Sequence, residues 1–239
     1  GLRGIRMSLA YPDQFIVQLK AILKASLYGD IKILYPMVCD AAEVVQANET
    51  LERIKEEFRL KQIPFNEDIE VGAMIETPSS AICADLLLKE VDFISIGTND
   101  LIQYLLAVDR INENVAHLYK PFHPSVLKTL KSVFEAAKAA GKKVSICGEL
   151  GGDPMATLFL LGLGNLTDLS MDPHSIPKVK KIICQSSMEE AKQIADHVLA
   201  LRSADEINNF LGEEMWKRFP SDFPRDAKFG ENITSEKRQ

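Results

Sequence analysis

The sequence predicts an α/β protein whose strands form a parallel sheet or a barrel. Short apolar runs that favour strands alternate along the chain with helical patterns. The runs are continuous rather than alternating, which is typical of parallel strands covered on both faces. A repeated strand–helix order of this kind indicates a parallel sheet or barrel. The predicted strands are Ile31–Met37, Ile69–Ile75, Phe93–Ile96, Val144–Cys147 and Leu166–Met171.

Helices are predicted between and after these strands. Amphipathic or charged segments end at glycine or begin after proline, as the helix that Gly141 follows illustrates. After Ser186 the pattern is purely helical, with Ser203 as an expected N-cap. From Pro220 onward the chain is polar with little periodicity, so we divide it into a domain at 1–219 and a polar tail at 220–239. The predicted helices are Gln14–Leu27, Ala41–Leu60, Ser79–Lys89, Ser125–Ala140, Met155–Leu161, Ile176–Ile183, Met188–Leu201 and Asp205–Phe219.

Composition and charge exclude several classes of protein. The 239 residues carry a net charge of −6, so no global field attracts nucleic acid or an anionic membrane. No apolar run approaches the roughly 18 residues of a membrane span, and no signal-peptide layout begins the chain. The four cysteines are scattered without a CxxC pair, which argues against zinc and predicts a reducing cytoplasm.

Polar residues follow three successive predicted strands. The first of these strands runs into Glu76-Thr77-Pro78, the next into Gly97-Thr98-Asn99-Asp100, and the third into Cys147-Gly148-Glu149. In barrels and open α/β sheets the loops after the strands form the active site. One acid after a strand is weak support, because helix N-caps use Asp routinely. Three such strand ends together predict a functional site.

Glu76 and Asp100 are candidate ligands of a divalent cation. They end neighbouring strands, and neighbouring parallel strands lie about 4.8 Å apart. Mg²⁺ typically takes one or two protein carboxylates and fills its other positions with water and substrate oxygens. In the alternative interpretation Asp100 caps the next helix and Glu76 pairs with an arginine. The two carboxylates together favour metal.

Candidate anion-binding groups lie beside these carboxylates. Asn99 and the backbone N–H groups of Thr98–Leu101 form a turn into a helix, a ready anion site. Arg110 suits a bidentate grip on phosphate or carboxylate. Its alternative is a surface salt bridge with Asp109 or Glu113. The same ambiguity applies to the arginines at positions 3 and 6.

Cys147 ends a strand beside glycine-shaped turns and a glutamate. A cysteine so placed can act as an acid or a nucleophile, depending on its thiol pKa. The alternative, an inert thiol in the core, is usual for cysteines in apolar segments and suits Cys39 and Cys83.

The run Phe93–Arg110, FISIGTNDLIQYLLAVDR, closely resembles the signature of phosphoenolpyruvate-utilising enzymes. The GLRGIR motif at residues 1–6, the MIETP motif at 74–78 and the CGELGGD motif at 147–153 occur in the same order in that family. The resemblance spans roughly residues 1 to 200. It is most similar to the enzyme I family of the bacterial sugar phosphotransferase system, in its sugar or its nitrogen-regulatory branch.

The resemblance implies a fold and a role for each site residue. The fold is a (β/α)₈ barrel of the phosphoenolpyruvate/pyruvate type, of which this sequence holds about five strands. Glu76 and Asp100 would bind Mg²⁺. Phosphoenolpyruvate would be bound by Arg3, Asn99 and Arg110. Cys147 would be the acid that protonates the enolate carbon as pyruvate forms.

The resemblance also implies partners. In the family the phosphoryl group passes to a histidine on a separate N-terminal domain, which this sequence lacks, and from there to a histidine-containing phosphocarrier protein. The family also forms homodimers. The main hypothesis is therefore a phosphoenolpyruvate–protein phosphotransferase domain that is inactive as an isolated fragment. The alternatives are a dimerisation module without activity and the branch of phosphoenolpyruvate synthase or pyruvate phosphate dikinase.

Overall fold

The computed structural model describes residues 1–223. Five strands form one sheet: β1 (Ile33–Tyr35), β2 (Val71–Ile75), β3 (Phe93–Gly97), β4 (Lys143–Cys147) and β5 (Leu166–Leu169). The helices up to α6 are α1 (Ile5–Ala10), α2 (Pro12–Ala25), α3 (Ala41–Leu60), α4 (Pro78–Ile82), α5 (Ala84–Leu87) and α6 (Thr98–Leu105). After them come the 3₁₀ turns η1 (Ala116–Leu118) and η2 (Glu149–Gly152), and α7 (Pro124–Ala139), α8 (Thr157–Gly162), α9 (Ile176–Cys184), α10 (Met188–Ala200) and α11 (Ala204–Arg218).

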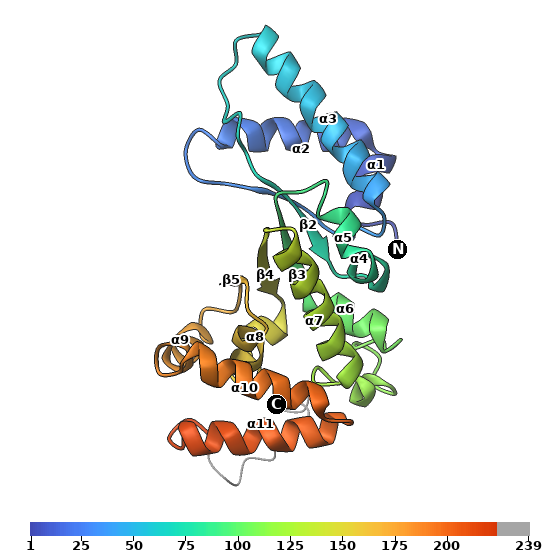
Figure 1. Ribbon diagram of the computed structural model, residues 1–239. Helices are drawn as coiled ribbons and strands as arrows, with labels where there is room; N and C mark the ends of the chain where they lie inside the picture. Colours follow the sequence, from blue (N-terminus) through green and yellow to red (C-terminus); the bar gives the residue numbers. More distant parts are fainter. Residues whose placement is uncertain (224–239) are drawn as a thin grey trace, which may run out of the picture.

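The sheet is parallel throughout, and its strands lie in chain order from β1 to β5. Each strand is followed by helical segments that return the chain to the start of the next strand, as expected of parallel strands. Within residues 1–223, β1 and β5 pair on one side only, so the barrel is not closed. Figure 1 shows α1–α3 at one end of the sheet, α8–α11 at the other, and α4–α7 along one side.

The two faces of the sheet differ in composition. The face toward the helices is apolar and fully covered, with Ala73, Ile94 and Ile146 at zero exposure. The opposite face carries small or polar side chains, among them Ser145 and Cys147, which are half-buried. The expectation of strands covered on both faces holds for β2 and β3, which are buried at all but one position each, and fails for β4 and β5, which are partly exposed. The residues on the face away from the helices include glycine, serine and cysteine. Because these residues are small and only weakly polar, the sequence shows no clear alternation of apolar and polar positions.

All five predicted strands are confirmed, and most predicted helices are present within a few residues. The helix predicted at 79–89 is divided into α4 and α5, because the chain turns at Cys83. The expected N-cap of α11 is confirmed, since the Ser203 hydroxyl accepts from the Glu206 N–H. Short α1 had no predicted counterpart.

The end of the described chain packs against α9. The Phe223 side chain is buried, and the Asp222 carboxylate pairs with Lys181 at 2.5 Å. The rest of the predicted tail, residues 224–239, lies outside the described residues.

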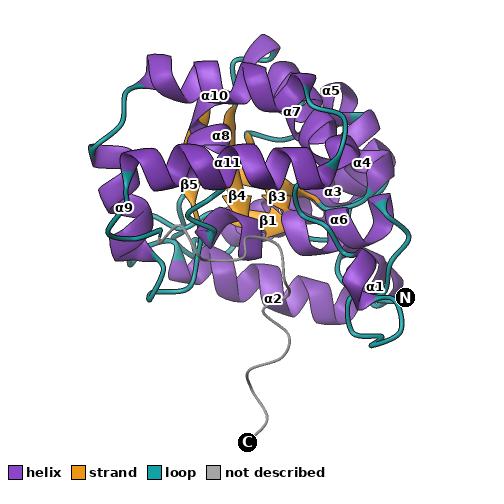
Figure 2. Cartoon of the chain, turned by 90° about the horizontal axis from the view of Figure 1, so that it is seen from below, coloured by secondary structure: helices purple, strands orange, loops and turns teal. Residues whose placement is uncertain are grey.

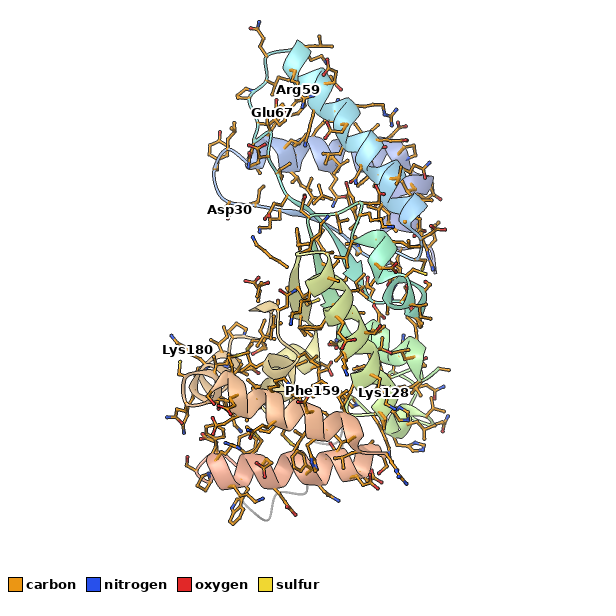
Figure 3. All side chains as sticks on the ribbon, viewed as in Figure 1. Asp30, Arg59, Glu67, Lys128, Phe159 and Lys180 are labelled. Carbon is orange, nitrogen blue, oxygen red and sulfur yellow. The ribbon has the colours of Figure 1, made fainter. Side chains whose placement is uncertain are left out.

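Helices also pack against one another away from the sheet. α8 packs closely on α10, and Phe159 of α8 is fully buried (Figures 1 and 3). Viewed from below in Figure 2, α11 runs across the molecule in front of the strands. At the other end of the protein, Arg59 pairs with Glu67 at 2.6 Å on the surface (Figure 3). None of the helices within residues 1–223 has the length and apolarity to cross a membrane.

Candidate active site

The site lies where β2, β3 and β4 end. Gly97, the last residue of β3, lies directly beside the Glu76 side chain that follows β2. A Cβ added at position 97 would stand 2.8 Å from Glu76 Oε2, closer than real contacts allow. Glycine at this position leaves room for the Glu76 carboxylate, on which the charge of Asp100 in the first turn of α6 acts.

Glu76 is held in a buried position. It is 6% exposed, and its Oε1 accepts a hydrogen bond of 2.6 Å from the Met37 N–H. Burial raises the pKa of this carboxyl, and the charge of Asp100 raises it further, while the Met37 hydrogen bond and the charge of Arg3 oppose both effects. The predicted pairing of Glu76 with an arginine as its direct partner is absent from the described hydrogen bonds and ion pairs.

Asp100 lies in the first turn of α6 and pairs with Arg3. The distance between Arg3 Nη2 and Asp100 Oδ1 is 2.9 Å, and Nη2 also donates to the Tyr104 hydroxyl at 3.2 Å. The alternative role of Asp100 as a helix cap is not observed, because α6 has no side-chain cap. Arg6 has a different partner, because its Nη2 donates to Cys39 Sγ at 3.0 Å.

Asn99 and Arg110 meet at the loop after β4. The Asn99 side-chain oxygen accepts from the Glu149 N–H at 2.9 Å, and Arg110 Nη1 pairs with Glu149 Oε1 at 3.0 Å. Gly148 makes this approach possible. Its φ is +90°, and a Cβ there would stand 2.8 Å from Asn99 Oδ1. The salt bridge of Arg110 therefore crosses the site, instead of joining Asp109 or Glu113 nearby in sequence.

Cys147 faces the inner side of the sheet. Its Sγ accepts from the Ser95 hydroxyl at 3.5 Å and lies 3.4 Å from the Ile96 carbonyl oxygen. Burial raises the pKa of the thiol; the Ser95 hydrogen bond lowers it, and the charge of Glu76 raises it. The thiol is therefore protonated at neutral pH. Cys39 and Cys83 were expected in the core, but Cys39 is half-buried and Cys83 is exposed on the outer surface of the helices after β2.

Two residues of this cluster had no predicted role. Glu149 was noted only as a neighbour of Cys147, yet it binds Arg110. Tyr119 lies in the loop between α6 and α7, and the charges of Glu149, Arg110 and Asp100 affect its pKa. Nothing in the sequence around Tyr119 indicated that it would lie near these residues.

The pair Glu76 and Asp100 fits a hard divalent cation with few protein ligands. Within residues 1–223 no group of three or more His, Cys, Asp or Glu side chains could hold a metal. The charge of Asp100 disfavours the ionised form of Glu76, and Glu76 is buried with one oxygen left free by the Met37 hydrogen bond. Such a donor set, all oxygen and limited to two carboxylates, suits Mg²⁺ that keeps water and substrate ligands.

Curated proteins are similar in sequence to most of the chain. It is 48% identical over 211 residues to a phosphoenolpyruvate-protein phosphotransferase of Buchnera aphidicola subsp. Baizongia pistaciae, covering 88% of this chain and 36% of that protein. The protein of the same name from Haemophilus influenzae is 46% identical over 213 residues, covering 89% of this chain and 37% of its own length. The chain thus spans little more than a third of the curated relatives it matches.

Solved structures support the fold. A citrate lyase from Burkholderia xenovorans matches 87% of this chain and 69% of its own, with a TM-score of 0.54 at 16% identity. A pyruvate kinase from Cryptosporidium parvum matches 74% of this chain and 35% of its own, with a TM-score of 0.51 at 16% identity. Both likenesses concern the α/β architecture alone.

The family model described as "PEP-utilising enzyme, PEP-binding domain" matches residues 1–188, which include every strand and every residue of the site. The chain therefore belongs to the family of phosphoenolpyruvate-utilising enzymes and carries their phosphoenolpyruvate-binding domain.

Proposed function

We propose that this chain is the catalytic domain of a phosphoenolpyruvate–protein phosphotransferase of the enzyme I type. The reaction breaks the bond between phosphorus and the enol oxygen and forms a phosphorus–nitrogen bond to a histidine on another domain. Protonation of the enolate carbon then gives pyruvate. The observation that supports this proposal most is the meeting of two carboxylates, two arginines and a protonated thiol at three neighbouring strand ends.

Arg3, Asn99 and Arg110 would bind and orient the substrate. Guanidinium groups grip phosphate and carboxylate oxygens through paired N–H donors. The two arginines now hold Asp100 and Glu149 at 2.9 and 3.0 Å, which shows that each guanidinium reaches a carboxylate within the site. Phosphoryl transfer depends chiefly on positioning and charge neutralisation, so such grips supply most of what the protein must provide.

Glu76 and Asp100 would hold Mg²⁺. When bound, the cation would neutralise charge on the phosphoryl and enolate oxygens. Without a cation, burial and the nearby charge of Asp100 disfavour the ionised form of Glu76 and raise its pKa. The site is therefore arranged to gain stability on binding a cation.

Cys147 would deliver the proton that converts the enolate to pyruvate. Its raised pKa keeps the proton on sulfur at neutral pH, and Ser95 orients the thiol from the neighbouring strand. A thiol that has given up its proton recovers it from water.

The test is autophosphorylation of the full-length protein by phosphoenolpyruvate in the presence of Mg²⁺. We expect Glu76→Ala and Asp100→Ala to lose this activity. The exposed Glu49→Ala variant is the matched control, because Glu49 lies on α3 away from the strand ends. Near-normal rates in both site variants would contradict the metal assignment.

The phosphoryl acceptor distinguishes the branches of the family. We propose a histidine-containing phosphocarrier protein as the next acceptor, a homodimer as the working assembly and the cytoplasm as the location. The curated relatives named above are all phosphotransferases, which supports this branch over the synthase or dikinase. Phosphate transfer to a nucleotide-linked domain would contradict it, and sedimentation of the full-length protein tests the dimer.

A further inference from the structure

Thr98 begins α6 and is completely buried, although its side chain is polar. Its hydroxyl donates a hydrogen bond of 2.8 Å to the backbone carbonyl oxygen of Cys147. A buried hydroxyl needs a partner, because an unpaired polar group in the interior is costly. Here the partner is the backbone of the residue that we propose as the acid, and the contact joins the turn after β3 to the turn after β4.

This contact begins where the pairing of the two strands ends. Gly97 and Cys147 are the last paired residues of β3 and β4. The carbonyl that Thr98 holds belongs to the peptide unit between Cys147 and Gly148. Gly148 has a φ of +90°, and glycine leaves the backbone freer to rotate than other residues do. The Thr98 hydrogen bond therefore fixes a peptide unit that glycine would otherwise leave free to rotate.

The two turns are in close contact at Gly148. A Cβ at this position would stand 2.6 Å from Thr98 Oγ1, closer than real contacts allow. On the other side of Gly148, the Asn99 side-chain oxygen accepts from the Glu149 N–H at 2.9 Å. The first two residues of α6 thus hold the backbone on both sides of this glycine, and the Thr98 contact is the one that reaches the proposed acid.

The thiol itself has only weak contacts with β3. Cys147 Sγ lies 3.5 Å from the Ser95 hydroxyl oxygen and 3.4 Å from the Ile96 carbonyl oxygen. Because sulfur is a weak hydrogen-bond donor and acceptor, these contacts constrain the thiol less than a bond between oxygen atoms would. The backbone of Cys147, which Thr98 holds at 2.8 Å, therefore sets the place of the sulfur.

We propose that Thr98 positions Cys147 for proton transfer: its hydroxyl holds the Cys147 carbonyl so that the thiol delivers its proton to one face of the enolate carbon. A general acid must lie within reach of the atom that takes the proton, so its placement limits the step. Thr98 acts through the backbone of Cys147 and does not touch the substrate. In the step the S–H bond breaks, a C–H bond forms, and the thiolate recovers a proton from water. The inference rests on the proposed function, because it takes Cys147 to be the acid.

The stereochemistry of the pyruvate formed tests this role. The full-length protein with Mg²⁺ converts phosphoenolpyruvate that carries deuterium at one of its two C3 positions, in tritiated water, and the chirality of the pyruvate methyl group is measured. We expect one configuration from wild type, because a fixed acid adds the proton to one face. Thr98→Val, which removes the hydroxyl and keeps the branched shape, should give a mixture. It should also slow pyruvate formation about tenfold, the scale of one hydrogen bond, with phosphoenolpyruvate affinity unchanged.

The outcomes separate positioning from a structural role. Partial unfolding cannot produce a mixture, because the molecules that stay folded would still add the proton to one face. Thr98→Ser keeps the hydroxyl and should restore one configuration. Thr50→Val is the matched control, since Thr50 is also buried and donates to a backbone carbonyl, that of Gln46 on α3, at 3.0 Å. One configuration from Thr98→Val, or a mixture from Thr98→Ser, would overturn the inference.

Failure of the proposed function gives a different pattern. One configuration from Cys147→Ala would contradict the acid role and the inference with it, whereas a mixture from Cys147→Ala with one configuration from Thr98→Val would overturn the inference alone. If wild type forms no pyruvate, the placement of the thiol is measured by its rate of alkylation with iodoacetamide, followed on the peptide that contains Cys147 by mass spectrometry. Thr98→Val should then react several-fold faster than Thr98→Ser, because a released backbone exposes the half-buried thiol. Equal rates would overturn the inference.

Discussion

Two glutamates at opposite ends of β2 have opposite electrostatic environments. Glu70 precedes the strand, is partly exposed, and pairs with Lys32; this hydrogen bond, with a smaller effect of Lys143, lowers its pKa. Glu76 follows the strand and is 6% exposed, and burial raises its pKa. The ionised form of glutamate is thus stabilised just before β2 and destabilised just after it.

The contrast extends to the two ends of the sheet. At the amino ends of the strands, polar groups satisfy one another. The Asp92 carboxylate accepts from the Val71 N–H at 2.8 Å, and Asn165 donates to the Lys142 carbonyl at 2.9 Å. At the carboxyl ends the ion pairs involve the proposed substrate-binding groups, Arg3 with Asp100 and Arg110 with Glu149. The hydrogen bonds at the amino ends stabilise the fold, whereas the charged groups at the carboxyl ends are those that we propose to bind the ligand.

The largest expected effect separates the two glutamates by activity. Glu76→Gln should lower Mg²⁺-dependent phosphoryl transfer by about 10²–10³-fold, the range for loss of one group that stabilises transition-state charge. It should also abolish the rise in melting temperature caused by Mg²⁺. Glu70→Gln should retain both. Equal losses in the two variants would remove the distinction between the ends of β2.

Next in size is the effect of the thiol. Cys147→Ala should leave phosphoenolpyruvate affinity unchanged and slow pyruvate formation about 10²-fold, the lower range for general acid catalysis. Single-turnover kinetics with isotopically labelled substrate measure the two steps separately. Cys83→Ala, at an exposed cysteine outside the site, is the control. Unchanged turnover in Cys147→Ala would remove its role as the acid.

A smaller effect concerns pH. Because the pKa of Glu76 is raised in the fold, its contribution to stability is fully present below its ordinary value of 4.5 and is lost as the pH rises through the raised value. Without divalent cations, the unfolding free energy of wild type should therefore fall relative to that of Glu76→Gln as the pH rises from 4 to 7. Urea unfolding in chelator at both pH values measures the difference. A constant difference would show that burial does not penalise this carboxylate.

The smallest effect concerns Glu70. Its lowered pKa means that its contribution is present above the ordinary value of 4.5 and is lost as the pH falls through the lowered one. Because the side chain is 36% exposed, solvent screens the pair, and Glu70→Gln should cost less than about 1 kcal/mol of unfolding free energy at pH 7. Added salt should reduce that cost further. A loss that salt does not change would point to packing instead of charge.

The sequence predicted the strand ends well because glycine, proline and acids there mark sharp turns. Glu76, Asp100 and Asn99 were found on this basis, and in the structure they lie at the carboxyl end of the sheet. Their partners were not predictable. The pairing of Arg110 with Glu149 joins two loops, and that of Arg3 with Asp100 joins the start of the chain to α6. Such contacts depend on how loops fold back, which periodicity does not report.

The order of the strands has a consequence for how the protein forms. Every pairing in the sheet joins one strand to the next along the chain, from β1 to β5. Each strand therefore docks on an edge that the preceding segment has already built, and no pairing waits for a distant part of the chain. Each pairing still spans a whole crossover segment, which makes parallel sheets slower to form than helical bundles, but the sheet can grow by one strand–helix unit at a time during synthesis on the ribosome.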